Sequence, residues 1–201
     1  CREFVLSDKS KPIIDMWTSV MNGWEPPTWV SNEEYDDYKK YKSQYLDDPM
    51  FAWCGYGLSF GGKWFGGFAR GGDKGQTSEL MQKNQKKALL RKRDAVKKFC
   101  SFLSLKCHSY TDTPDLKGLM YCDPPYRGRT KAHHATGDFN HDDFWDWCSK
   151  RKSTVLVTEF KVPENVEVLH AWGDTIVRHN NSKGSDGTNE RLIKITGGLY
   201  D

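Results

Sequence analysis

The sequence has few of the features that mark metal-binding, secreted or membrane proteins. Its six cysteines include no CxxC pair, which excludes a zinc ribbon and argues against a disulfide framework in a chain of 201 residues. Reduced thiols, as in the cytosol, are therefore expected. No apolar run approaches the length of a membrane span, and no signal peptide is evident. The sequence thus predicts a cytoplasmic protein without a membrane partner.

An excess of charge of one sign is also missing. The chain has 30 Lys and Arg against 27 Asp and Glu, so the net charge is only +3. Any affinity for nucleic acid must therefore come from a local patch. Aromatic residues, in contrast, make up 13% and include eight Trp, which predicts a packed core rather than disorder. The length suits one domain, or one core with an insertion.

The two ends of the chain have an α/β pattern. Residues 3–7 predict a short strand that ends at Asp8, and a helix then opens with Ser10 as its cap and ends at Gly23. The same rhythm returns after residue 104. There the sequence predicts strands over 118–122 and 153–159, an amphipathic helix over 142–150, and a hairpin of 166–179 with 190–196.

The middle of the chain follows another pattern. Residues 31–46 predict a polar helix, and residues 54–72 are too rich in glycine for regular helix. Residues 79–103 predict a further helix with one apolar face, formed by Leu89, Val96, Phe99 and Leu103. We therefore expect an α/β core of residues 1–23 and 105–201, with a mainly helical domain of residues 24–104 inserted into it.

The motif Asp123-Pro124-Pro125-Tyr126 directly follows a predicted strand, at the sheet edge where α/β proteins bind ligands. The Asp123 carboxylate and the Pro124 carbonyl could accept both N–H bonds of an exocyclic amine while it attacks a methyl group. Because proline restricts φ, these acceptors would be preorganised. Tyr126 offers a flat face for a base extruded from a duplex. A proline-rich turn in which Asp123 caps its own backbone is the alternative.

The stretch "YCDPPYRG", with "GWEPP" and "SFGGKWFGG" upstream, resembles the adenine-N6 DNA methyltransferases of the Dam type (D12 class), especially short phage-type members. The similarity covers essentially the whole chain. It implies a Rossmann-like methyltransferase core with an inserted target-recognition domain. It also implies S-adenosyl-L-methionine (AdoMet) as cofactor, double-stranded DNA as substrate, and a monomer in the cytoplasm of a bacterium or phage-infected cell.

The same resemblance implies the cofactor contacts. Asp8 matches the acidic position that hydrogen-bonds the cofactor ribose, although an Asp after a strand is also a common helix cap. Ser109 and Tyr110 fall where the family contacts the cofactor adenine, and Asp112 is an alternative there. Asp123 is expected to face the cofactor as well as the base.

Phe60-Gly61-Gly62 resembles an AdoMet glycine loop, but its position argues against that role. It follows Asp8, whereas the cofactor loop of the family precedes the acidic strand end, and no capped helix follows it at once. The resemblance instead implies a hairpin-like recognition element, with Lys63 or Arg70 on DNA. Its aromatic residues, Trp64, Phe65 and Phe68, are expected to pack internally. The cofactor loop is then missing from these residues, so we expect a chain without its amino-terminal portion, or one completed by a second chain.

Basic residues between 83 and 98 form a dense run on a predicted helix. Such a run can be a solvated helix face, but inside a recognition domain it favours contact with phosphates, led by Lys87 and Arg91, and salt-dependent binding. Arg127, Arg129 and Lys131 follow the DPPY motif and could hold the DNA backbone beside the flipped base.

Three histidines, His133, His134 and His141, suggest a metal site, but no acidic or Cys residue completes a ligand spacing. We expect no metal and interpret them as loop residues near DNA. Glu159 ends a predicted buried strand and could line the same cleft as the DPPY motif.

These patterns favour a site-specific DNA methyltransferase that acts on the N6 amine of a flipped adenine. The alternative is a non-catalytic DNA-binding remnant of the fold that no longer binds the cofactor. An RNA or protein amino-methyltransferase is a third possibility, against which the recognition insertion argues.

Overall fold

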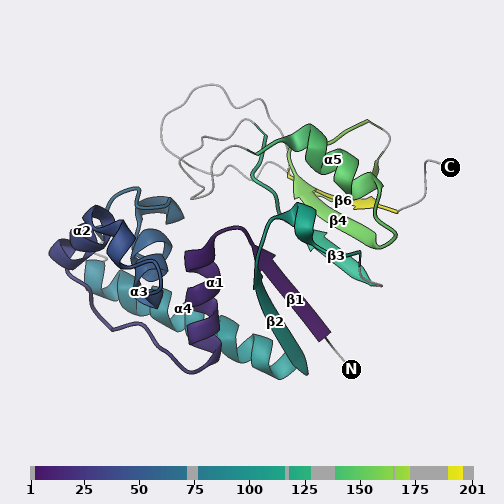
Figure 1. Cartoon of the computed structure of the whole chain (residues 1–201). Coiled ribbons are helices and arrows are strands. Elements are labelled where there is room, and N and C mark those ends of the chain that lie inside the picture. Colours follow the sequence, from purple (N-terminus) through teal and green to yellow (C-terminus); the bar gives the residue numbers. More distant parts are fainter. Residues whose placement is uncertain are drawn as a thin grey trace, which may run out of the picture. The chain divides into compact units, whose positions relative to one another are not determined.

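The structure of the protein is a computed structural model that describes residues 3–71, 77–115, 118–127, 139–164, 166–172 and 190–196 (Figure 1). It is a mixed α/β protein, as the sequence predicts, with parallel and antiparallel strand pairs. The chain divides into two compact units. The first comprises Cys1–Thr113 with Ala132–Gly137, and the second Pro114–Lys131 with Asp138–Asp201.

The first unit opens with the predicted strand and helix. Strand β1 (Glu3–Asp8) leads into helix α1 (Lys11–Met21), and Gly23 follows the helix with a φ of 101°, a left-handed conformation that glycine adopts freely. Ser10 is the N-cap residue but its side chain forms no capping bond. The Ser10 backbone N–H donates to Asp8 Oδ1 at 2.7 Å, which forms an Asx-turn just before the helix.

A second parallel strand, β2 (Phe102–Cys107), corrects the predicted helix over 79–103. Helix α4 (Ser78–Phe99) ends earlier, because Cys100 is extended and β2 pairs along the whole of β1. Leu103 therefore lies in a strand, and Phe99 is 52% exposed. Of the predicted apolar face only Leu89 is buried. Strand pairing thus overrides the local preference of these residues.

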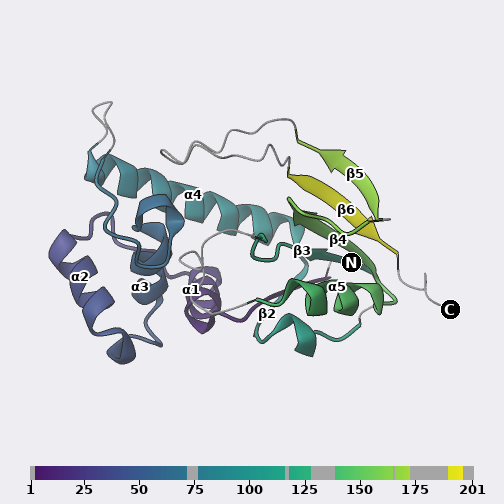
Figure 2. The same cartoon turned by 90° about the horizontal axis from the view of Figure 1, so that it is seen from above.

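The helices between β1 and β2 are shorter than the sequence suggests. Helix α2 (Asn32–Lys40) begins with a capping box, in which Ser31 and Glu34 bond each other's backbone N–H, and a 3₁₀ turn (Lys42–Gln44) replaces its predicted end. Helix α3 (Pro49–Ala52) runs into a π-helical turn (Trp53–Gly57). Figure 2 shows α1 and α3 beside the long helix α4.

The core of the first unit is an aromatic cluster around Tyr35, which is fully buried. The Phe65 and Phe68 rings pack against the Tyr35 ring, and the Trp64 ring contacts Phe65, so the packing role predicted for these three residues is confirmed. The Tyr35 hydroxyl hydrogen-bonds Ser59 Oγ at 2.8 Å and accepts from the Gly67 N–H at 3.2 Å. Tyr35 therefore fixes both sides of the glycine-rich segment.

Gln82 on α4 is the other buried polar anchor of this unit, with 1% of its surface exposed. Its side-chain Oε1 accepts from the Val30 N–H at 2.8 Å, and its Nε2 donates to the Val30 carbonyl at 2.9 Å. Val30 is also buried, so this amide satisfies both polar groups of a buried peptide segment.

The second unit is a four-stranded sheet with the order β3-β4-β6-β5, along which helix α5 (His141–Ser149) lies (Figure 1). Strands β3 (Leu119–Cys122) and β4 (Thr154–Glu159) are parallel, and β6 (Arg191–Ile195) is antiparallel to β4 and to β5 (Glu167–Ala171). The predicted strands, helix and hairpin are confirmed for the described residues. The central strand β4 is buried at Val155, Val157, Thr158 and Glu159, as its apolar run indicates.

Asp115 holds the turn that leads into β4. Its carboxylate accepts from the backbone N–H of Lys152 at 2.6 Å and of Ser153 at 3.2 Å, and from the Ser153 hydroxyl at 2.9 Å. The hydrogen bond from Lys152, followed by those from Ser153, lowers the pKa of the Asp115 carboxyl group. The ionised form is therefore the one that stabilises the folded turn.

This shift predicts a pH-dependent stability for Asp115→Asn. Because the folded pKa lies below the unfolded value of about 3.9, the charge contributes stability above that pH and loses it as the pH falls through the folded pKa. We expect the variant to melt at a lower temperature than wild type at pH 7. The difference should shrink as the pH falls below about 4. Thermal melts from pH 7 to pH 3 measure it, and a constant difference would contradict the assignment.

Candidate active site

The DPPY segment continues from the carboxyl end of β3, beside the end of β4. Because Cys122 lies opposite Val157 in the parallel register, the next residue, Asp123, comes level with Thr158. The Thr158 hydroxyl donates to Asp123 Oδ1 at 2.9 Å. It also lies 3.1 Å from the Tyr121 hydroxyl. The carboxylate is thus held from the neighbouring strand, and none of its hydrogen bonds within the described chain caps its own turn.

Two acceptors of the motif remain open. Asp123 is exposed, and within the described residues its Oδ2 atom has no hydrogen-bond partner. The Pro124 carbonyl also lacks a donor there, although the Pro124 residue is buried. A carboxylate and a carbonyl separated by one peptide bond are the pair that the predicted amine chemistry needs.

Tyr126 has an anchored ring. Its hydroxyl donates to Glu190 Oε1 at 2.6 Å, and its ring meets that of Phe160 edge-to-face, with centroids 4.7 Å apart. Burial, and then the hydrogen bond to Glu190, raise the pKa of Tyr126 well above its ordinary value. The phenol therefore stays protonated and neutral at physiological pH, and the ring is only partly buried.

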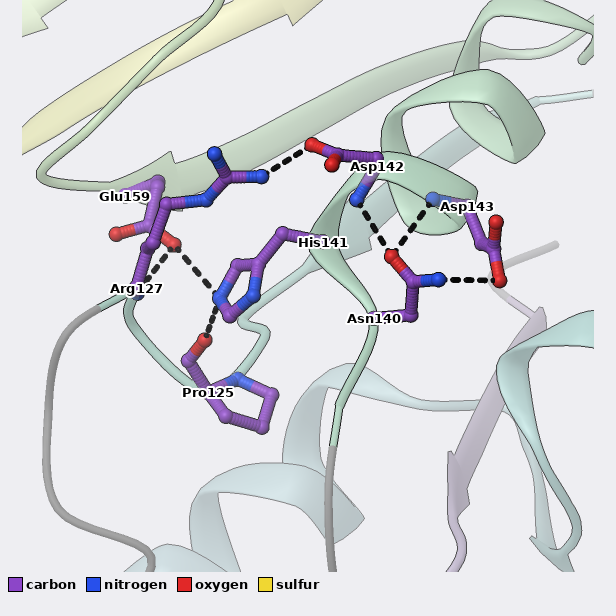
Figure 3. Close-up of polar contacts among 7 residues, drawn as sticks. All are labelled: Pro125, Arg127, Asn140, His141, Asp142, Asp143 and Glu159. Carbon is purple, nitrogen blue, oxygen red and sulfur yellow. Dashed lines mark hydrogen bonds and ion pairs between the residues drawn. The ribbon is translucent and has the colours of Figure 1, made fainter.

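Two residues support the loop from within the unit (Figure 3). Glu159 is fully buried and accepts from the backbone N–H of Phe160 at 2.7 Å and of Arg127 at 3.2 Å. His141 Nε2 lies 2.7 Å from the Pro125 carbonyl oxygen and 3.7 Å from Glu159 Oε2. The expectation that His141 is a loop residue near DNA is therefore wrong in its first part, because His141 is the first residue of α5.

The structure describes Arg127 but not most of the other basic residues near the motif. The Arg127 guanidinium forms an ion pair with Asp142, and contact of Arg127 with DNA stays a prediction. Arg129, Lys131, His133 and His134 lie outside the described residues. Among the residues that are described, no group of three His, Cys, Asp or Glu side chains could hold a metal ion.

The predicted cofactor residues of the first unit lie together at one sheet edge. Asp8 pairs with Cys107 at the carboxyl ends of β1 and β2, and the His108 N–H donates to the Asp8 carbonyl at 3.1 Å. Ser109 and Tyr110 follow directly, where Ser109 Oγ caps a 3₁₀ turn over Tyr110–Asp112. Contact of Asp8, Ser109 and Tyr110 with a cofactor stays a prediction. Asp8 is not the cap of α1, which was its alternative role: the N-cap residue is Ser10, and the Asp8 carboxylate accepts from the Ser10 N–H just before the helix.

The glycine-rich segment forms a short hairpin. Phe60 N–H donates to the Gly67 carbonyl and Ala69 N–H to the Leu58 carbonyl, both at 2.8 Å, around an isolated bridge between Ser59 and Phe68. The segment follows a π-helical turn rather than a strand, and Phe60–Gly62 is itself a 3₁₀ turn. Arg70 is exposed and Lys63 partly exposed, so both are accessible to DNA, which stays a prediction.

The basic residues of α4 divide into two groups. Lys86 and Arg93 form ion pairs with Glu25, and Arg93 also with Asp94, so part of their charge holds the fold. Lys87 and Arg91, one helical turn apart, are exposed beside Asn84 in a surface hollow. The other exposed basic residues of the helix are Lys83, Lys92, Lys97 and Lys98. The helix therefore presents cations that the described fold does not neutralise.

Neither protein-family models nor curated proteins match this chain. Its function therefore has to be argued from its own residues. None of the helices in the described part of the chain is long and apolar enough to cross a membrane.

Sequence reasoning missed three contacts of the DPPY segment. Thr158 could have been found, because a polar residue at the carboxyl end of a buried strand beside the motif is itself a signal. The bond from His141 to Pro125 and that from Tyr126 to Glu190 had no such signal. Both join residues whose separation in space depends on how the intervening chain folds.

Proposed function

We propose that this protein is an AdoMet-dependent methyltransferase that acts on the N6 amine of adenine in double-stranded DNA. The observation that carries the proposal is the pair of open acceptors at the end of β3. Asp123 Oδ2 and the Pro124 carbonyl lie within one rigid dipeptide, and the partly buried ring of Tyr126 follows two residues later. The resemblance of the motif to Dam-type enzymes supports the same function.

The chemistry follows from the adenine amine, whose lone pair is conjugated into the ring. When the Asp123 carboxylate and the Pro124 carbonyl accept its two N–H bonds, the nitrogen can become tetrahedral and direct its lone pair outward. The Thr158 hydroxyl holds the carboxylate in place before the base arrives, so little reorganisation is needed. The Tyr126 ring would stack on the extruded base. AdoMet would supply the electrophilic methyl group; the residues for which the sequence predicts contact with it, Asp8, Ser109 and Tyr110, belong to the first unit.

The DNA contacts are proposed from charge and exposure. Lys87 and Arg91 on α4, with Lys63 and Arg70 on the hairpin, are available to phosphates. Contacts of this kind release counterions, so binding should weaken steeply as salt rises. The carboxylates of Glu25 and Asp94, which pair with Lys86 and Arg93, make those two cations poorer candidates.

The test is methylation by the product of the gene, incubated with tritiated AdoMet and genomic DNA from a strain without adenine methylation. N6-methyladenine at one short sequence, mapped by single-molecule sequencing, is the expected result. Methylation of cytosine N4 would contradict the adenine assignment, and methylation of RNA or protein alone would contradict the DNA substrate. Salt-dependent DNA binding without any methyl transfer would support the non-catalytic remnant instead.

Tyr126→Ala should weaken capture of the flipped base. If the ring stacks on the base, its loss costs about 1–3 kcal/mol. Tyr126→Phe is the matched control, because it keeps the ring and removes the hydroxyl that bonds Glu190. A fluorescent adenine analogue at the mapped target reports extrusion as an increase in emission. Equal increases for wild type and Tyr126→Ala would exclude stacking on this residue.

A further inference from the structure

The backbone around Pro124 and Pro125 has few groups that can hold the loop in place. Prolines 124 and 125 have no N–H group, so neither residue can donate a backbone hydrogen bond that would hold the loop against the sheet. After Pro124, the backbone groups that the described unit holds are the Pro125 carbonyl and, beyond Tyr126, the Arg127 N–H. Both of these groups are engaged.

Glu159 grips the far end of the loop from a buried position. A fully buried carboxylate is costly unless donors satisfy it, and here backbone N–H groups do so. One carboxylate oxygen takes the Phe160 N–H, which fixes the side chain to its own strand end. The other takes the Arg127 N–H, which fixes the loop. Its side chain thus ties the end of β4 to the chain immediately after Tyr126.

His141 grips the near end. Its Nε2 atom is 2.7 Å from the Pro125 carbonyl oxygen, a contact that requires a proton on Nε2. The backbone at this point is fixed by Asn140, the N-cap of α5, whose Oδ1 accepts from the N–H groups of Asp142 and Asp143 (Figure 3). The Phe139 ring packs edge-on against the imidazole, with centroids 5.0 Å apart. The imidazole is therefore held by the start of α5 as well as by its hydrogen bond to the Pro125 carbonyl.

We propose that His141 and Glu159 are positioning residues that clamp the two peptide groups around Tyr126, so that the Pro124 carbonyl and the Tyr126 ring face the base in a fixed geometry. This inference rests on the proposed function. Neither residue touches the base in this role, because Glu159 is fully buried and His141 bonds the loop through the Pro125 carbonyl. Misplacement of a reacting group by about 1 Å can cost on the order of 100-fold in rate.

The test compares single-turnover methyl transfer by His141→Ala, His141→Gln and the control His170→Ala, an exposed histidine of β5 in the same unit. We expect His141→Ala to lower the rate constant about 10- to 100-fold while the Kd for DNA stays within about twofold of wild type. His141→Gln should recover most of the rate, because its amide N–H can replace the Nε2–H donor. Wild-type rates in His141→Ala, or equal losses in both His141 variants, would overturn the proposal.

A second arm needs no activity. Amide hydrogen exchange should show a protected Arg127 N–H in wild type, and about 10-fold or faster exchange in Glu159→Ala but not in Glu167→Gln, an exposed strand carboxylate. An unprotected Arg127 N–H in wild type, or equal protection in Glu159→Ala, would overturn the clamp. If wild type transfers no methyl group, the proposed function fails, whereas the clamp itself is then judged by this exchange alone.

Discussion

An Asp123→Ala variant is expected to methylate adenine about 100- to 1,000-fold more slowly than wild type, because it removes one of two preorganised acceptors from the reacting amine. The Pro124 carbonyl remains, so some rate should survive. The methylation rate of Asp123→Asn should lie between those of wild type and Asp123→Ala. Its amide keeps one oxygen but loses the charge that the Thr158 hydroxyl stabilises. Tritium transfer to DNA at saturating substrate measures these rates.

DNA binding separates this loss from damage to the fold. Fluorescence anisotropy with the target duplex should give Kd values close to wild type for both Asp123 variants, because the substitutions leave every cation proposed to bind phosphate in place. The matched control is Asp146→Asn, which alters an exposed carboxylate on α5 that pairs with Lys150. Its turnover should be normal. Equal turnover in Asp123→Ala and this control would refute the role of Asp123.

Gln82→Leu should lower the free energy of unfolding by about 2–5 kcal/mol, although it replaces a polar side chain by an apolar one of similar size in a buried position. The reason is that the substitution leaves the backbone of Val30 without its hydrogen bonds. Within the described residues, Gln82 alone satisfies the N–H and the carbonyl of Val30, and each buried group left without a partner costs about 1–3 kcal/mol. Urea unfolding, followed by tryptophan fluorescence, measures the change.

Gln85→Leu is the control for that change. It makes the same substitution one helical turn along α4, where Gln85 is exposed. Its unfolding free energy should stay within about 0.5 kcal/mol of wild type. If the two variants unfold at the same urea concentration, water or another donor must replace Gln82 at Val30, and the anchor assignment is wrong.

The sequence predicts the second unit well and the first less well, for a physical reason. The strands β3 and β4 and the helix α5 carry strong local patterns, and the strand-end motif marks the site. Strand β2 was missed because "FLSLKC" has an ambiguous period and follows a long helix without a break. Only its pairing with β1 decides the structure.

The contacts of the candidate site also differ in how far the sequence predicts them. Asp123, Pro124 and Tyr126 follow from their order in the chain, since residues next to each other need no fold to meet. Thr158 meets Asp123 through strand register, which a sequence shows only once both strands and their direction are known. The contact from Tyr126 to Glu190 spans 64 residues, and no local pattern encodes it.

The two hydrogen bonds of the Thr158 hydroxyl have the same donor-to-acceptor direction, toward Asp123. A hydroxyl has a single proton, and because Thr158 gives its proton to the Asp123 carboxylate, Tyr121 must be the donor in the contact between the two hydroxyls. The three groups form a polarised relay whose dipoles all point toward the carboxylate. Tyr121 is 60% exposed at the outer end of that relay. The hydroxyl that holds the carboxylate is therefore itself held by a phenol of β3, two residues before Asp123.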